Sequence, residues 1–175
     1  MEWLWSGWRL GQSAGLGSDG QPHANLKPAP GKSLFETIEQ SGLSDEETYI
    51  LARWTYTFAI LNVFPYNPGH VMILPLAPVR SISELPDETA TELWDAVRQS
   101  TVAVKKAYSP AGLNIGINEG SAGGGSQVDH LHVHIVPRWR GDTNFMSTTS
   151  DVRILPETLR SSWDRLRASW PEKLD

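Results

Sequence analysis

Apolar and polar residues alternate along two short stretches in the first half of the chain, as they do in β-strands with one buried face. Residues 55–61 place Tyr56, Phe58 and Ile60 on one side, and residues 70–75 form a second, mostly apolar run. The segment between these runs is rich in proline, asparagine and glycine, which favour a tight turn. The pattern therefore predicts an antiparallel hairpin.

The residues before this hairpin open with a helix signal. Ser44 and Glu47 match a capping box, in which each side chain bonds the backbone N–H of the other residue. The dense run of Tyr, Thr, Ile, Phe and Trp after residue 48 favours strands instead. We therefore expect a short turn at residues 44–47 and then a hairpin between residues 49 and 61.

Two later segments repeat apolar residues at spacings of three and four, which predicts helices with one buried face. The first begins at Pro86, is followed by acids that suit the positive end of a helix dipole, and ends before Pro110. The second occupies the tail, residues 156–170. The expected buried positions are Ala90, Leu93, Trp94, Val97, Thr101, Val104 and Tyr108, and then Leu159, Trp163, Leu166 and Trp170.

Residues 112–118, between the two helices, predict another strand. Leu113, Ile115 and Ile117 alternate with asparagine and glycine. We expect the three apolar side chains to face the core, and the other face to lie where backbone or a ligand comes close.

Three of the chain's five histidines alternate with apolar residues in the second half of the chain. His130, His132 and His134 are separated by Leu131 and Val133. If this segment is one β-strand, the three imidazoles project from the same face, roughly 7 Å from one to the next. We therefore expect a strand with an apolar face and a chemically active face.

Such a row of histidines has three interpretations. It can be a hydrogen-bonded sheet face with no further role, a zinc site, or a nucleophile with supporting groups. The preceding residues favour the third, because four glycines lie between residues 120 and 125, followed by Ser126. Glycines let backbone N–H groups approach phosphate oxygens closely, and a metal site has no need of this. Phosphate chemistry is therefore the hypothesis, with Arg138 and Arg140 as candidate anion contacts.

Composition narrows the possibilities further. The chain has 175 residues, enough for one domain, and a formal net charge of -5, which argues against broad nucleic-acid binding. The absence of cysteine excludes disulfides and thiolate zinc sites. No apolar run approaches the length of a membrane span and no signal peptide is evident, so we expect a cytoplasmic protein. Trp3, Trp5 and Trp8 begin an N-terminal arm that we expect to pack or to form an interface.

The motif from His130 to Val136 resembles the signature of the histidine-triad (HIT) family, in which alternating histidines are followed by hydrophobic residues. Three further segments agree in order and spacing: the hairpin from Asn62 to His70, the segment beginning at Asn118, and the glycine-rich loop. The resemblance implies an α+β fold, with an antiparallel sheet of about five strands, one main helix and a C-terminal helix. It also implies a homodimer.

The resemblance implies a division of the chain and a chemistry. Residues 1–44 form an N-terminal arm and loop, residues 45–150 the HIT domain, and residues 151–175 a C-terminal helical extension of that domain. His132 is the nucleophile that attacks the α-phosphorus of a nucleotide, His134 contacts the phosphate or leaving group, and His130 and His70 belong to the supporting hydrogen-bond set. No cofactor or metal is required.

The same resemblance assigns the substrate contacts. Asn62 and the hairpin are expected near the base and ribose. The full set of nucleotide- or phosphate-binding residues is Asn62, Asn118, Gly124, Gly125, Ser126, Gln127, His134 and Trp139. The expected partners are a dinucleoside polyphosphate and inorganic phosphate, with no nucleic acid and no membrane.

Residues 4–10, 65–70 and 137–145 resemble the diadenosine tetraphosphate phosphorylase branch of the family. In related hydrolases the glycine before the triad is followed by glutamine, whereas here Ser126 follows Gly125 and leaves room for phosphate as the second acceptor. The prediction is therefore phosphorolysis of diadenosine tetraphosphate to ATP and ADP through an AMP-histidine. Hydrolysis of dinucleoside polyphosphates or adenosine phosphoramidates by water, and a nucleotide-binding regulatory module, are the alternatives.

One feature departs from the family pattern. Many relatives carry a Cys-x-x-Cys zinc pair near the start of the domain, where this chain has Ser33 and Glu36. A structural zinc held by cysteines is therefore excluded here, which affects how the fold is fastened and not the catalytic step.

Overall fold

The computed structural model describes residues 26–125, 127–142 and 157–171. The N-terminal arm with Trp3, Trp5 and Trp8, and Ser126 of the glycine-rich loop, lie outside these ranges. Among the described residues, no helix combines the length and the apolar character needed to cross a bilayer.

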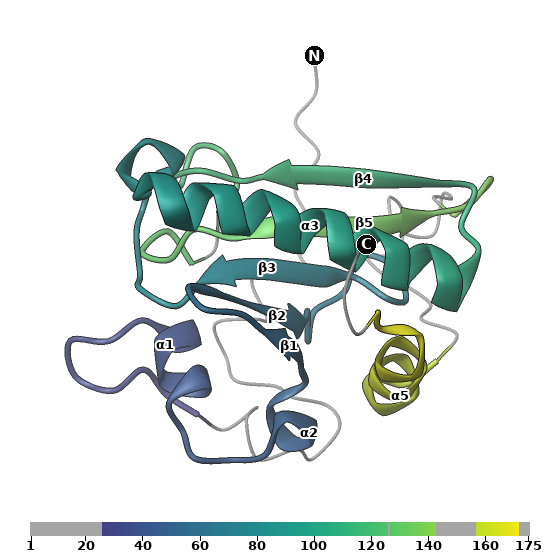
Figure 1. The fold of residues 1–175 in the computed structure, drawn as a ribbon, viewed down its shortest axis with the longest axis horizontal. Helices are drawn as coiled ribbons and strands as arrows, with labels where there is room; N and C mark the ends of the chain where they lie inside the picture. The colour runs from purple at the N-terminus through teal and green to yellow at the C-terminus, as the bar shows by residue number, and fades with distance from the viewer. Residues whose placement is uncertain (1–25, 126, 143–156, 172–175) are drawn as a thin grey trace.

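The fold is α+β, with a five-stranded antiparallel sheet in the order β1-β2-β3-β5-β4 (Figure 1). This agrees with the predicted fold class. The strands are β1 (Ile50–Arg53), β2 (Thr57–Leu61), β3 (Val71–Pro75), β4 (Gly112–Ile117) and β5 (Val133–Arg138). The helices are α1 (Leu34–Glu39), α2 (Asp45–Thr48), the 3₁₀ turn η3 (Ile82–Glu84), α3 (Asp87–Tyr108) and α5 (Leu159–Ser169).

Local signals explain where several elements begin and end. The predicted capping box forms at α2, where the Ser44 hydroxyl accepts from the Glu47 N–H and the Glu47 carboxylate accepts from the Ser44 N–H. Pro86 is the N-cap of α3, which ends at Tyr108 as predicted, and Ser109 takes a left-handed conformation. β2 begins at Thr57, so the prediction that Tyr56 belongs to its buried face is wrong; Tyr56 lies in the turn and is exposed.

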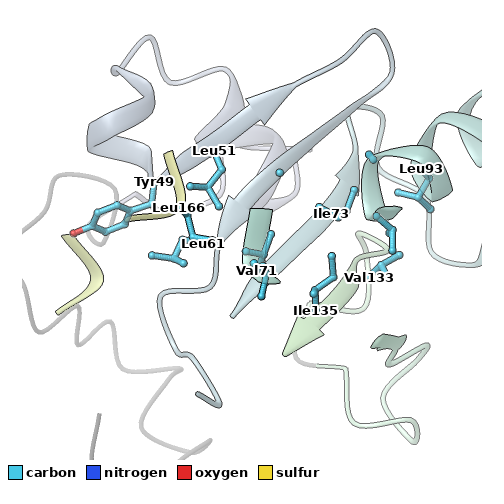
Figure 2. Packing of buried hydrophobic residues seen from close by; sticks show 13 residues of the cluster. Tyr49, Leu51, Leu61, Val71, Ile73, Leu93, Val133, Ile135 and Leu166 are labelled. Atoms are coloured by element: carbon cyan, nitrogen blue, oxygen red, sulfur yellow. The ribbon is translucent and has the colours of Figure 1, made fainter. Parts of the chain in front are cut away.

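The two faces of the sheet are covered by different helices. On one face, α3 and α5 pack on residues from β1, β2, β3 and β5, and Figure 2 shows Leu93 of α3, Leu166 of α5 and the strand residues Val71, Ile73 and Val133 in this cluster. On the other face, Phe35 and Ile38 of α1 pack on residues from β1, β2 and β3. All five residues of β2 are therefore buried.

β4 is an edge strand and is less covered than expected. Leu113 and Ile117 pack against the core, but the side chain of Ile115 is 45% exposed. The prediction that all three face the core is therefore wrong for Ile115, which lies on the edge strand β4, paired only with β5 (Figure 1).

Candidate active site

The histidine segment is only partly a strand. β5 begins at Val133, so His134 lies on the strand while His130 and His132 precede it. The ladder with β3 pairs residues 71–73 and goes no further, because Pro75 has no N–H and its carbonyl accepts from the ring Nε2 of His130 at 2.8 Å. The prediction that all three histidines project from one face of one strand is therefore wrong. The rings of His132 and His134 nevertheless lie 4.7 Å apart between centroids.

His132 is held in one tautomer. Its Nδ1 lies 2.8 Å from the backbone oxygen of His130, which can only accept, so Nδ1 carries the ring hydrogen. In the neutral ring Nε2 then keeps its lone pair. No hydrogen bond joins Nε2 to any side chain or backbone group within the described residues. The ring is buried except for 6% of the residue's surface, and burial lowers the pKa of His132, which keeps the ring neutral and nucleophilic.

His130 is fully buried beside it. Its Nε2 donates to the Pro75 oxygen, so its Nδ1 is the acceptor in the 2.6 Å hydrogen bond with the Ser33 hydroxyl. Burial is the main reason that the pKa of His130 is lowered; the Pro75 carbonyl acts in the opposite direction. The Phe35 ring covers both imidazoles, with centroids 5.7 Å from His130 and 5.5 Å from His132.

His70 and His134 form a second linked pair. The backbone N–H of Tyr66 donates to Nδ1 of His70 at 3.1 Å, and the amide of Asn62 lies 3.3 Å from the same atom. Nε2 of His70 is therefore the donor to Nδ1 of His134 at 3.0 Å. This leaves the hydrogen of a neutral His134 ring on Nε2. That nitrogen lies 3.4 Å from the Asn118 amide, to which it donates when the amide is turned with its oxygen toward the ring.

The structure thus brings the four predicted histidines together with Asn62 and Asn118. The Asn62 side chain also accepts from the Phe64 N–H at 3.0 Å, so its contacts within the described residues are to the hairpin and His70. His134 is 8% exposed and lies next to His132, where a phosphate oxygen can accept from its Nε2–H.

The glycine-rich loop is more compact than expected. The N–H groups of Gly124 and Gly125 donate to the carbonyls of Ser121 and Gly120. The prediction that successive amides of this loop point inward for phosphate is therefore wrong for these two residues. Glycine is needed here for packing, because a Cβ on Gly123 would lie 2.3 Å from the Glu119 carbonyl oxygen. Ser126 is not described, and Gln127 is partly buried, with its carbonyl 3.4 Å from the His130 N–H.

The segment after β5 has structural contacts. Arg138 forms a two-point ion pair with Asp142, at 2.6 and 2.8 Å, and this guanidinium holds the pKa of Asp142 well below its usual range. Asp142 also accepts from Asn67, which fastens the end of β5 to the hairpin turn. The predicted nucleotide contact Trp139 packs edge-on against Tyr108, at 6.2 Å between centroids. Arg138 therefore stabilises the fold, and Arg140 is exposed.

Two site residues were missed by sequence reasoning. Ser33, the N-cap of α1, and Phe35, within α1, contact the triad from a segment about 97 positions earlier in the chain. Ser33 and Glu36 have the spacing of a helix start, so the local sequence could have predicted α1. It could not have predicted the contact between Ser33 and His130, which are far apart in the chain. In the described part of the chain, no three His, Asp or Glu side chains are grouped as a metal site requires.

Comparisons with known proteins place this geometry in context. The family model of the HIT domain matches residues 45–141. AP-4-A phosphorylase of Mycobacterium tuberculosis is 36% identical over 167 residues, which covers 95% of this chain and 83% of that protein. The asymmetrical bis(5'-nucleosyl)-tetraphosphatase of Schizosaccharomyces pombe is 34% identical over 93 residues, 53% of this chain and 50% of its own length.

Solved structures agree on the fold. A Hit-like protein involved in cell-cycle regulation from Bartonella henselae superposes with a TM-score of 0.65 at 23% identity, covering 82% of this chain and 99% of that one. At this identity the likeness establishes the arrangement of strands and helices.

Proposed function

Because the chain belongs to the HIT domain family, we propose that it is a nucleotidyl transferase that cleaves dinucleoside polyphosphates by phosphorolysis. Diadenosine tetraphosphate and inorganic phosphate would give ATP and ADP. The reaction passes through an adenylyl group bound to His132.

The observation that supports this function is the hydrogen bond from Nδ1–H of His132 to the His130 carbonyl at 2.8 Å. It directs the lone pair of the neutral ring to Nε2, the nitrogen that must attack. When Nε2 bonds to phosphorus the ring becomes cationic, and the same carbonyl then faces a more acidic N–H. The hydrogen bond therefore strengthens as the intermediate forms, which is the differential binding that catalysis requires.

The chemical steps balance without a cofactor. Nε2 of His132 attacks the α-phosphorus, the bond from that phosphorus to the bridging oxygen breaks, and ATP leaves with the electron pair. His134 donates from Nε2 to an oxygen of the phosphoryl group or of the leaving ATP. An oxygen of inorganic phosphate then attacks the adenylyl phosphorus, the N–P bond breaks, and ADP leaves the restored imidazole.

Phosphate as the second acceptor is supported by the extent of similarity. The relative named as a phosphorylase matches 95% of this chain, whereas the tetraphosphatase matches 53% of it. The first match includes residues on both sides of the 45–141 segment, among them those of α1 and most of those of α5.

The test is a product analysis of diadenosine tetraphosphate cleavage with phosphate varied from none to saturating. We expect ATP and ADP in equal amounts, at a rate that rises with phosphate and is low without it. ATP and AMP formed at a rate independent of phosphate would contradict phosphorolysis and establish hydrolysis, the reaction named for the fission yeast relative. If the substrate is not cleaved and no adenylyl group is found on the protein, a nucleotide-binding regulatory module is favoured over an enzyme.

A further inference from the structure

Ser33 joins helix α1 to the histidine cluster. Its side chain is buried, and its Oγ lies 2.6 Å from Nδ1 of His130. The same Oγ accepts from the backbone N–H of Glu36 at 3.0 Å, which makes Ser33 the N-cap of α1. Residue 33 precedes the segment 45–141 that matches the family model.

The direction of each hydrogen bond follows from the groups involved. The Pro75 carbonyl can only accept, so His130 carries its hydrogen on Nε2 and offers a lone pair at Nδ1. The Ser33 oxygen already accepts from an N–H, and its own hydrogen is therefore available for His130. Ser33 is the donor, and His130 is held at both ring nitrogens in one tautomer.

The orientation of His130 matters for the nucleophile. The backbone carbonyl of the same residue accepts from Nδ1 of His132 at 2.8 Å. Phe35, two residues after Ser33, packs on both rings. A change in how the His130 ring is anchored therefore moves the carbonyl that selects the tautomer of His132.

We infer that Ser33 is a positioning residue for the nucleophile: its hydroxyl donates to His130, and through the His130 backbone it holds His132 with Nε2 unprotonated. Helix α1 thus contributes to the active site by holding Ser33 against His130. The effect on turnover rests on the proposed function, but the effect on the two imidazoles does not.

Three substitutions at position 33 distinguish the two roles of the Ser33 side chain, which are to donate a hydrogen bond to His130 and to cap helix α1. Ser33→Thr keeps both the hydroxyl donor and the cap. Ser33→Asp keeps a side-chain cap for the Glu36 N–H but replaces the donor with a carboxylate acceptor. Ser33→Ala removes both. A fourth variant, Thr37→Val, is the control for anchoring of α1, because Thr37 bonds the Ala29 N–H and the Ser33 carbonyl and does not contact His130.

The first readout is the protonation of the imidazole nitrogens by ¹⁵N NMR at pH 7.5. In the unsubstituted chain and in Ser33→Thr and Thr37→Val, we expect hydrogen on Nε2 of His130 and on Nδ1 of His132. In Ser33→Asp, we expect Nδ1 of His130 to become protonated, because a carboxylate favours the cation. The other charged or titratable groups acting on this ring are Glu36 of α1, Asp129 and His132, and none of them is altered.

The second readout is steady-state cleavage of diadenosine tetraphosphate. Ser33→Thr and Thr37→Val should retain kcat within about threefold, whereas Ser33→Asp and Ser33→Ala should lose about tenfold or more in kcat with little change in KM, the size expected when one buried hydrogen bond is lost. The acid limb of the kcat profile should move to higher pH in Ser33→Asp only.

The inference is overturned if Ser33→Asp keeps the tautomers and kcat of Ser33→Thr, since capping alone would then explain the residue. If Ser33→Ala does not fold, the comparison of the Asp and Thr variants still decides. If the unsubstituted chain cleaves no dinucleoside polyphosphate, the proposed function fails, and the NMR comparison still tests the role of Ser33.

Discussion

The hydrogen bond from His132 to the backbone carbonyl of His130 sets the tautomer of the nucleophile. The Pro75 carbonyl and the Ser33 hydroxyl hold the ring of His130, and its backbone carbonyl accepts from His132. Burial removes water from both imidazoles, and a desolvated imidazole is more stable in its neutral form than as a cation. The burial that keeps His132 neutral and nucleophilic therefore also makes the stability of the folded chain depend on pH.

This coupling predicts that stability falls in mildly acidic solution. Burial lowers the pKa of both His130 and His132 below the ordinary value of 6.5. At a pH between the lowered pKa values of the folded chain and the ordinary value of the unfolded chain, these histidines bind protons in the unfolded chain and not in the folded chain. The stabilisation is thus fully present above pH 6.5 and is lost progressively as the pH falls below it. The free energy of unfolding, measured with urea between pH 5 and 8, should be nearly constant above pH 6.5 and should decline as the pH is lowered from 6.5 to 5.

His132→Asn is the matched comparison for this titration, because it removes one of the two buried imidazoles and keeps a side chain that can donate to the His130 carbonyl. Its stability should fall less steeply between pH 6.5 and 5 than that of the unsubstituted chain. Equal slopes would contradict the assignment of a lowered pKa to His132.

Alternation along the sequence identified His130, His132 and His134, because it is a local property. The resemblance to the HIT family, and not the spacing, added His70, Asn62 and Asn118, which the structure brings to the same site. The sequence did not reveal Ser33, since a contact between positions 33 and 130 depends on how α1 packs beneath the sheet. The sequence pattern also predicted a β5 that is too long at its start. Pro75 of β3 has no N–H to donate to the ladder, and its carbonyl accepts from the His130 ring.

Periodicity located the helices well. Spacings of three and four predicted α3 and α5 within a few residues, because each helix has one buried stripe. The prediction that Trp94 belongs to the stripe of α3 is wrong, since Trp94 is 48% exposed. Edge position is not a local property, which is why Ile115 of β4 was expected inside and is exposed. The compact turn of the glycine-rich loop was missed for a similar reason, since its N–H groups find carbonyls within the loop itself.

Two valines of α3 test the packing of this helix. Val104 is fully buried against the sheet, and Val102, two residues earlier, is 40% exposed. Val104→Ala should lower the free energy of unfolding by about 2 kcal/mol, since two buried methyl groups and a cavity outweigh the gain in helix propensity of about half a kcal/mol. Val102→Ala should change it by less than about 0.5 kcal/mol.

The comparison is made by urea denaturation of the two variants with the unsubstituted chain. A loss at Val102 equal to that at Val104 would show that the outer face of α3 is also covered in solution, and it would contradict the assignment of a single buried stripe.

Segments outside the family match complete the domain. α5 covers β1, where the indole of Trp163 donates to the Ile50 carbonyl at 3.0 Å and Arg167 donates to the Leu51 carbonyl at 2.6 Å. These bonds attach α5 to β1, which is an edge strand of the sheet. α1 covers the opposite face and reaches the triad through Ser33 and Phe35.

We propose that Nε2 of His132, held by the hydrogen bond to the His130 carbonyl, forms a covalent bond to phosphorus. The most direct measurement is rapid acid-free quenching of the full chain with diadenosine tetraphosphate in the absence of phosphate, followed by intact mass and peptide mapping. We predict one adenylyl group per chain on His132, which added phosphate converts to ADP, and none in His132→Ala. An adenylyl group on another residue, or turnover at a normal rate by His132→Ala, would contradict the account.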